Sequence, residues 1–139
     1  MSSNSRSPCA GCGAAILRDS KLLLVKRKRP PETNYWVPGG KVDWLEPVVA
    51  AVAREIAEEL GLAIRRSASL CVVDQIDGEH EEHWLAPICL VEDAVGEPRV
   101  LEPAALAGYG WFPLDELPAP LTRATQVAFA LLQALCSSA

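Results

Sequence analysis

The alternation of apolar and polar residues predicts strands on both sides of a central helix. Two apolar runs within residues 14–25 are separated by the polar segment Arg18-Asp19-Ser20-Lys21, which predicts a β-hairpin. Over residues 47–60 apolar side chains recur at steps of three and four positions, as they do on one face of an α-helix. Pro47 suits the start of this helix and Gly61 suits its end. Its apolar stripe is expected to contain Val49, Val52, Ala53, Ile56 and Leu60.

Further strands and a second helix are predicted in the rest of the chain. Residues 68–76 and 83–92 have strand-like patterns and are joined by an acidic turn at residues 77–79. A short closing strand is expected at residues 110–112, and a helix at residues 122–135. The apolar side of that helix is expected to contain Val127, Ala130, Leu131 and Ala134. Strands that flank two helices in one chain predict an α/β sandwich with a mixed sheet.

Length and composition fit one globular domain. The chain has 139 residues, and half of them are apolar, which is enough to build a hydrophobic core. Residues 1–10 are expected to form a disordered N-terminal tail, and residues 11–139 the domain.

Charge and cysteine content narrow the classes of partner. The formal net charge of -5 argues against non-specific binding to nucleic acid or to an anionic membrane. A small anionic ligand remains compatible with it, because a bound metal ion reverses the local sign of an acidic site. The five cysteines are expected to be free thiols in a reducing compartment, so the protein is expected to be cytoplasmic.

Three carboxylates on the predicted helix are the strongest candidates for chemistry. Glu55, Glu58 and Glu59 are three and four residues apart, so they are expected to share one face of the helix. Like charges this close repel one another unless a cation lies between them, and Mg²⁺ prefers carboxylate oxygens. Arg54 can reach Glu58 one turn further on, or Glu46 before the helix.

A glutamate-rich helix is more often a solvated surface than a metal site. Here, however, the acidic cluster follows a Pro-Gly-Gly turn, contains an arginine and ends in a glycine. The segment 40–62 is similar to the Nudix box, G-x5-E-x7-R-E-U-x-E-E-x-G-U with U a bulky aliphatic residue, at every specified position. These positions are Gly40, Glu46, Arg54, Glu55, Ile56, Glu58, Glu59, Gly61 and Leu62. The resemblance extends over about residues 11–135, and it implies a Nudix-type α/β/α sandwich.

The resemblance also implies an activity, a cofactor and roles for the motif residues. The family hydrolyses the diphosphate linkage of a nucleoside diphosphate joined to another group. By this likeness Mg²⁺, with Mn²⁺ as a substitute, is expected to bind the three helix carboxylates and the backbone carbonyl of Gly40, while Glu55 also helps to activate water. Glu46 and Arg54 are expected to form the pair that supports this arrangement. Glu102 lies where many members have one more carboxylate ligand; a surface glutamate is the equal alternative.

Residues outside the motif have less specific assignments. Arg27, in the basic segment 26–29, is a candidate to bind phosphate, or else a solvated strand end. Tyr35 or Trp44 is a candidate to stack on a base. His83 is a candidate to contact the substrate, although a structural histidine is the more frequent outcome.

The compact size favours a small-molecule nucleotide, most simply a nucleoside triphosphate cleaved to a monophosphate and pyrophosphate. ADP-ribose or another nucleoside diphosphate sugar is the alternative substrate within the class. A non-catalytic nucleotide sensor is the alternative from another class, and the intact motif argues against it. A nucleic-acid substrate is not expected, and either a monomer or a homodimer is compatible with the sequence. The identity of the base is left open.

Overall fold

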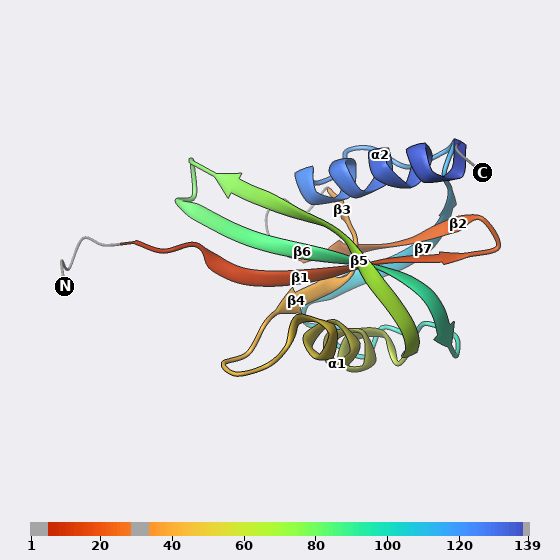
Figure 1. Ribbon diagram of the computed structural model, residues 1–139, viewed down its shortest axis with the longest axis horizontal. Coiled ribbons are helices and arrows are strands. Elements are labelled where there is room, and N and C mark those ends of the chain that lie inside the picture. Colours follow the sequence, from red (N-terminus) through yellow and green to blue (C-terminus); the bar gives the residue numbers. More distant parts are fainter. Residues whose placement is uncertain (1–5, 29–33, 138–139) are drawn as a thin grey trace.

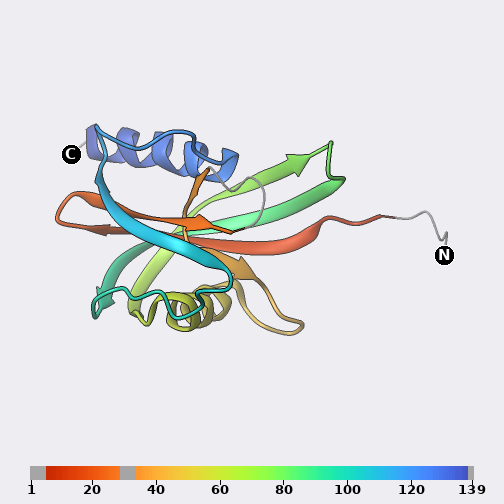
Figure 2. The ribbon, with the colours of Figure 1, turned by 180° about the vertical axis from the view of Figure 1, so that it is seen from behind.

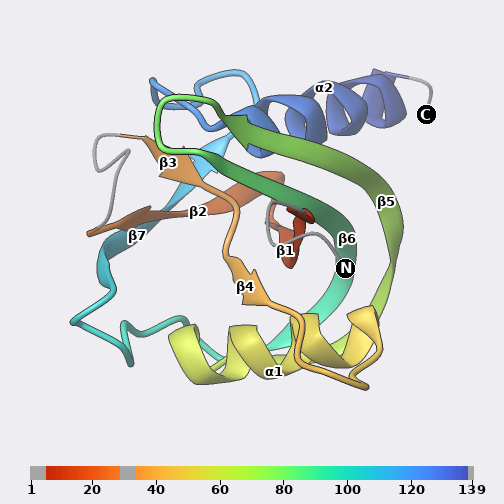
Figure 3. The same cartoon turned by 90° about the vertical axis from the view of Figure 1, so that its left-hand side faces the viewer.

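A seven-stranded mixed sheet lies between two helices in the computed structural model, which describes residues 6–28 and 34–137 (Figure 1). Viewed along the strands, α2 covers one face of the sheet and α1 the other (Figure 3). The expected α/β/α sandwich is thereby confirmed. The elements are β1 (Cys9–Arg18), β2 (Lys21–Arg27), β3 (Tyr35–Trp36), β4 (Gly39–Lys41), α1 (Val48–Leu60), β5 (Ala63–Asp77), β6 (Glu82–Val95), β7 (Leu106–Pro113) and α2 (Arg123–Ser137).

The sheet combines a parallel centre with antiparallel flanks. Its main path has the order β3-β2-β1-β6-β5, with β4 paired to β1 and β7 paired to β2. Strands β1 and β6 are parallel, and the other pairs are antiparallel. Figure 2 shows β7 running beside β2 on the side away from the β5–β6 hairpin. Among the described residues, no helix is long and apolar enough to cross a bilayer.

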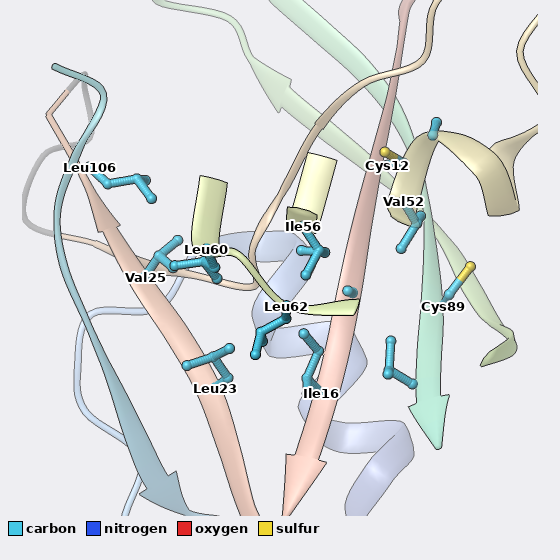
Figure 4. Close-up of a cluster of buried hydrophobic side chains, with 13 residues drawn as sticks. Cys12, Ile16, Leu23, Val25, Val52, Ile56, Leu60, Leu62, Cys89 and Leu106 are labelled. Carbon is cyan, nitrogen blue, oxygen red and sulfur yellow. The ribbon is translucent and has the colours of Figure 1, made fainter. Parts of the chain in front are cut away.

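Helix α1 packs on the sheet through the stripe predicted for it. Val52, Ile56 and Leu60 are buried against side chains of β1, β2 and β6 (Figure 4). The helix ends at Gly61, whose φ of 71° is a left-handed conformation that glycine adopts without strain. Val49 was wrongly assigned to the stripe: it is 56% exposed, and Ala51 is buried in its place. Val49 lies in the first turn, which extends past the edge of the packed face.

The buried side of α2 differs from the apolar side predicted for it. Ala124, Ala128 and Leu132 are buried, whereas Leu131 is 38% exposed and Ala130 is exposed as well. The helix is apolar around most of its circumference, so periodicity alone could not identify the face that meets the sheet. The buried residues contact the second core cluster, which includes Leu22, Leu24, Val73 and Ile88.

Several strands extend beyond the predicted segments. Strand β1 begins at Cys9, so residues 9 and 10 belong to the sheet and not to the expected tail; residues 1–5 of that tail lie outside the described part. Strand β5 starts at Ala63 and β7 at Leu106, earlier than expected. The early part of β5 is polar and exposed, so backbone pairing with β6 forms it there, without the apolar alternation used to predict strands.

Truncation of Ile56 is expected to destabilise the fold through this packing. Its side chain is fully buried between α1 and the sheet, so Ile56→Ala should lower the free energy of unfolding by about 2–5 kcal/mol. Val49→Ala on the same helix is a matched control, because its side chain is 56% exposed and should cost less than about 1 kcal/mol. Urea unfolding of the two variants measures the difference. Equal losses would mean that α1 does not pack as described.

Candidate functional site

One arginine connects the loop before α1 to the acidic side of the helix. Arg54 Nε donates to Glu46 Oε2 at 2.7 Å, and its Nη2 donates to Glu46 Oε1 at 2.9 Å. This paired contact is the main reason that the pKa of Glu46 falls to about 2, and the same contact raises the pKa of Arg54 above its ordinary value. Both side chains therefore keep their charges throughout the neutral pH range.

The same guanidinium reaches two of the helix carboxylates. Arg54 Nη1 donates to Glu55 Oε1 at 2.9 Å and to Glu58 Oε2 at 3.3 Å. Its Nη2 also donates to the backbone oxygen of Lys41 at 2.9 Å. Arg54 thus contacts both sequence-predicted partners, Glu46 and Glu58, in one conformation. One side chain therefore fixes β4, the following loop and α1 relative to one another.

A second arginine meets the third carboxylate from the other side. Arg27 Nη1 lies 3.4 Å from Glu59 Oε1, and the side chains of these two residues are 10% and 5% exposed. Arg27 also donates through Nη2 to the backbone oxygen of Gly39. Burial raises the pKa of Glu59 to about 7, opposed by the charge of Arg27 and reinforced by the charges of Glu55 and Glu102. Of the helix carboxylates, Glu59 is the one on which the charge of Glu102 acts.

The acidic side of α1 is less open than its spacing suggested. Glu58 is 51% exposed at its side chain, but Glu55 is 14% exposed and Glu59 only 5%. Among residues 6–28 and 34–137, no three histidine, cysteine, aspartate or glutamate side chains are gathered as a ligand cluster. Arg27 and Arg54 instead bind the helix carboxylates. Their spacing predicted a shared face of the helix, but spacing does not show which of these side chains the rest of the fold covers.

The chemistry of these groups still fits a hard divalent cation. The Oε2 atom of Glu59 is buried and accepts no hydrogen bond from any residue that the structure describes. A buried carboxylate oxygen without a partner is energetically costly, and an added cation would remove that cost. The backbone of Gly40 lies directly against the Glu55 carboxylate, so close that a Cβ at this position would overlap it. Carboxylate and backbone oxygens in this arrangement are the donors that Mg²⁺ prefers.

A cavity of about 400 Å³ adjoins this cluster, within the size range of ligand pockets. Gly40, Glu55 and Arg27 line it together with two indoles, those of Trp36 and Trp84, and the Arg27 guanidinium lies 5.5 Å from the centre of the Trp36 ring. Gly11 and Gly13 of β1 also line this cavity. A Cβ on Gly13 would lie 2.8 Å from Ile88 Cδ1, so the absence of side chains keeps this part of the cavity open. The cavity therefore brings charged and aromatic side chains together.

The structure places the residues predicted outside the motif in different surroundings. Arg27 lines the cavity, but Tyr35 does not, and it packs edge-on against Phe112 instead. Trp44 is 90% exposed in the loop between β4 and α1, away from the cavity. His83 Nε2 lies 3.1 Å from Asp74 Oδ1 and is likewise outside the cavity.

The indoles that line the cavity, Trp36 and Trp84, were missed by sequence reasoning. The alternation of side chains along β6 could have identified Trp84. Trp84, Ala86 and Ile88 occupy alternate positions of β6, and all three line the cavity. His83 has the opposite alternation and points to the other face.

Comparisons with known proteins give relatives for most of the chain. A family model described as NUDIX domain matches residues 9–135. The solved structure of a MutT NUDIX hydrolase from Burkholderia pseudomallei is 56% identical, with a TM-score of 0.87 over 91% of this chain and 98% of that one. A Mycobacterium tuberculosis protein named "Putative 8-oxo-dGTP diphosphatase 2" is 48% identical over 107 residues, or 74% of this chain and 72% of that protein. An ADP-ribose pyrophosphatase from Methanocaldococcus jannaschii is 33% identical over 112 residues, which cover 80% of this chain but just under two thirds, 65%, of that protein.

Proposed function

This chain belongs to the NUDIX family of hydrolases, and from that premise we propose that it cleaves a nucleoside triphosphate to a nucleoside monophosphate and pyrophosphate. The observation that supports the proposal most directly is the shared cavity. Glu55, Gly40 and the indoles of Trp36 and Trp84 line one space. A nucleotide has the same two kinds of group, charged phosphates and a flat base.

Members of this family generally need a divalent metal ion, and we propose Mg²⁺, with Mn²⁺ as a substitute. The ligands proposed for it are the carboxylates of Glu55, Glu58 and Glu59, the backbone oxygen of Gly40, and Glu102 as one further carboxylate. The unpartnered Oε2 of Glu59 supports this assignment. When bound, such an ion neutralises phosphate oxygens and lowers the pKa of a water molecule.

The side chains around this site have separate proposed roles. Glu55, which adjoins the cavity, accepts a proton from the attacking water. Arg54 and Glu46 hold the loop and the helix in register, a role that their paired contact supports. Arg27 lines the cavity with a guanidinium group, which suits contact with a phosphate oxygen. In the reaction the water oxygen bonds to phosphorus, the bond from phosphorus to the bridging oxygen breaks, and pyrophosphate leaves with that oxygen.

A dinucleotide-type substrate such as ADP-ribose is the second candidate, and the M. jannaschii relative named as an ADP-ribose pyrophosphatase favours it. A non-catalytic sensor fits less well, because every motif residue is present. The net charge of -5 favours a free nucleotide over nucleic acid as the partner. We propose a monomer or a homodimer.

A nucleotide panel tests the proposed activity. Purified protein is incubated with Mg²⁺ and each of the deoxynucleoside triphosphates, their oxidised forms and ADP-ribose, and products are separated by anion-exchange chromatography. We expect monophosphate and pyrophosphate from at least one triphosphate, and no product when EDTA removes the metal. Hydrolysis of ADP-ribose but of no triphosphate would favour the second candidate. Specific binding of a compound without its hydrolysis would favour the non-catalytic sensor.

A further inference from the structure

Strands β5 and β6 carry three exposed apolar side chains on the sheet face where α1 packs. Leu85 has the same alternation along β6 as Cys89, which belongs to the core cluster under α1. Val72 and Ile76 of β5 pair with residues two positions from Leu85, so they lie on the same face. Figure 1 shows that the β5–β6 hairpin extends beyond α1, and Val72 and Ile76 are 67% and 62% exposed. These three side chains form the sheet patch.

The loop between β4 and α1 carries a second group of exposed apolar side chains. Trp44 and Leu45 are 90% and 84% exposed, and Val49 in the first turn of α1 is more than half exposed. These three side chains form the loop patch. The loop and the free end of the β5–β6 hairpin project at the same end of the molecule, in views from the front and from behind (Figure 1, Figure 2).

Backbone contacts place the two patches next to each other. The backbone N–H of Val42, at the start of the loop, donates to the oxygen of Ala10 at 3.2 Å. Ala10 is itself exposed and pairs with Leu85 of the sheet patch. Trp44 follows Val42 by two residues. One strand, β1, therefore separates the start of the loop from the sheet patch.

Leu45 has a backbone conformation that is unfavourable for its residue type. Its φ is 64°, and it is the third residue of a turn in which the Glu46 N–H donates to the Asp43 oxygen at 3.0 Å. Glycine is the residue favoured at this position of such a turn, and a leucine there is strained. Because the Leu45 side chain is largely exposed, it gains little burial from the described residues in return. A contact outside the chain accounts for an apolar side chain at this position.

We propose that the two patches form the interface of a symmetric homodimer, in which the loop patch of each copy packs on the sheet patch of the other. Two-fold symmetry makes this contact twice. The exposed parts of the six side chains correspond to roughly 800 Å² per copy, about the share of one partner in a stable interface. One sequence thus supplies both a projecting apolar loop and an apolar strand surface for that loop to cover. The proposal does not depend on the catalytic activity.

Sedimentation velocity of the full chain over a dilution series tests the proposal. We expect a dimer, and Leu45→Gly should raise its dissociation constant about tenfold or more, the loss expected for an anchor residue of an interface. The same change relieves the strained turn, so weaker association cannot be assigned to unfolding if urea unfolding shows retained stability. Leu135→Ala removes an exposed leucine from α2 and should leave the dissociation constant unchanged.

Three results would overturn the proposal. The first is a monomer throughout the dilution series, and the second is an equal dissociation constant for wild type and Leu45→Gly. The third is a monomer that binds phosphatidylcholine vesicles through the same residues, which would assign the exposed side chains to a lipid surface.

A mixture of two variants tests whether loop and sheet patches meet across the interface. Leu45→Glu damages only the loop patch and Ile76→Lys only the sheet patch, so each variant alone has two damaged contacts in its dimer. In the mixed dimer the damaged patches face each other as an ion pair, and the second contact has the wild-type residues. We expect the mixture to associate at least tenfold more tightly than either variant alone. No gain on mixing would overturn the loop-to-sheet arrangement.

Discussion

Replacement of Glu55 by glutamine is expected to lower kcat/KM by a factor on the order of 10²–10⁴, the contribution of a positioned general base. Glutamine has the same shape and keeps one oxygen toward Arg54, but it loses the negative charge and the capacity to accept a proton. The fold should tolerate the change. Arg54 keeps its paired contact with Glu46 and one oxygen of the new glutamine, so the free energy of unfolding should change by no more than about 1–2 kcal/mol.

Three measurements separate the proposed role of Glu55 from a general loss of structure. Initial rates on the best triphosphate give kcat/KM, urea unfolding gives stability, and a calorimetric titration with Mg²⁺ reports metal binding. Glu116→Gln removes an equal charge from an exposed position far from the helix and should behave as wild type in all three. Near-wild-type turnover of Glu55→Gln at saturating Mg²⁺ would eliminate Glu55 as base and ligand.

Adjacent residues of one short helix have different tasks in this structure. Ile56 is fully buried and fixes α1 on the sheet, while Glu55 and Glu58 meet Arg54. Glu59 faces the interior and meets Arg27. A carboxylate with a pKa near 7 and an unpartnered oxygen is poorly satisfied by one arginine. This imbalance is what a divalent ion, when bound, would correct.

The parts of the fold that the sequence predicted well depend on local signals. The helix over 47–60 had strong periodicity, a proline at its start and a glycine at its end, and α1 spans Val48–Leu60. The hairpin around Arg18 to Lys21 had an equally local turn signal, and β1 and β2 pair there. The motif fixed the identities of Glu46 and Arg54, and their contact follows from residues only eight positions apart.

The parts that could not be predicted depend on contacts between distant residues. Glu59 is buried because Arg27, 32 positions earlier, packs against it, and no spacing within the helix contains that information. For a similar reason the sequence analysis named Tyr35 and Trp44 as the aromatic candidates, and neither lines the cavity. Trp36 on β3 and Trp84 on β6 line the same cavity because the sheet has the order β3-β2-β1-β6, and pairing order is not visible in any single strand.

The largest expected effect on stability comes from Gly39→Ala. A Cβ on Gly39 would overlap the backbone oxygen of Cys12 and the Cα of Gly13, both on the central strand β1. Gly13 is the residue paired with Gly39, so neither strand can move aside without breaking the ladder between β1 and β4. The cost should reach or exceed about 3 kcal/mol, the upper part of the range for overpacking, because no flexible side chain can yield.

Gly108→Ala provides a control with the same added methyl group in another strand. Nothing lies within 4 Å of a Cβ at Gly108, and the smaller entropy of the unfolded chain should make this variant equal to or about 0.4–1 kcal/mol more stable than wild type. The urea midpoint should therefore fall for Gly39→Ala and stay unchanged or rise for Gly108→Ala. The activity of Gly39→Ala should also fall, even in the fraction of protein that still folds. The reason is that the Gly39 carbonyl accepts a hydrogen bond from Arg27 and that Gly40 lies against Glu55. Coincident midpoints would show that β4 is not packed against β1 as closely as its register requires.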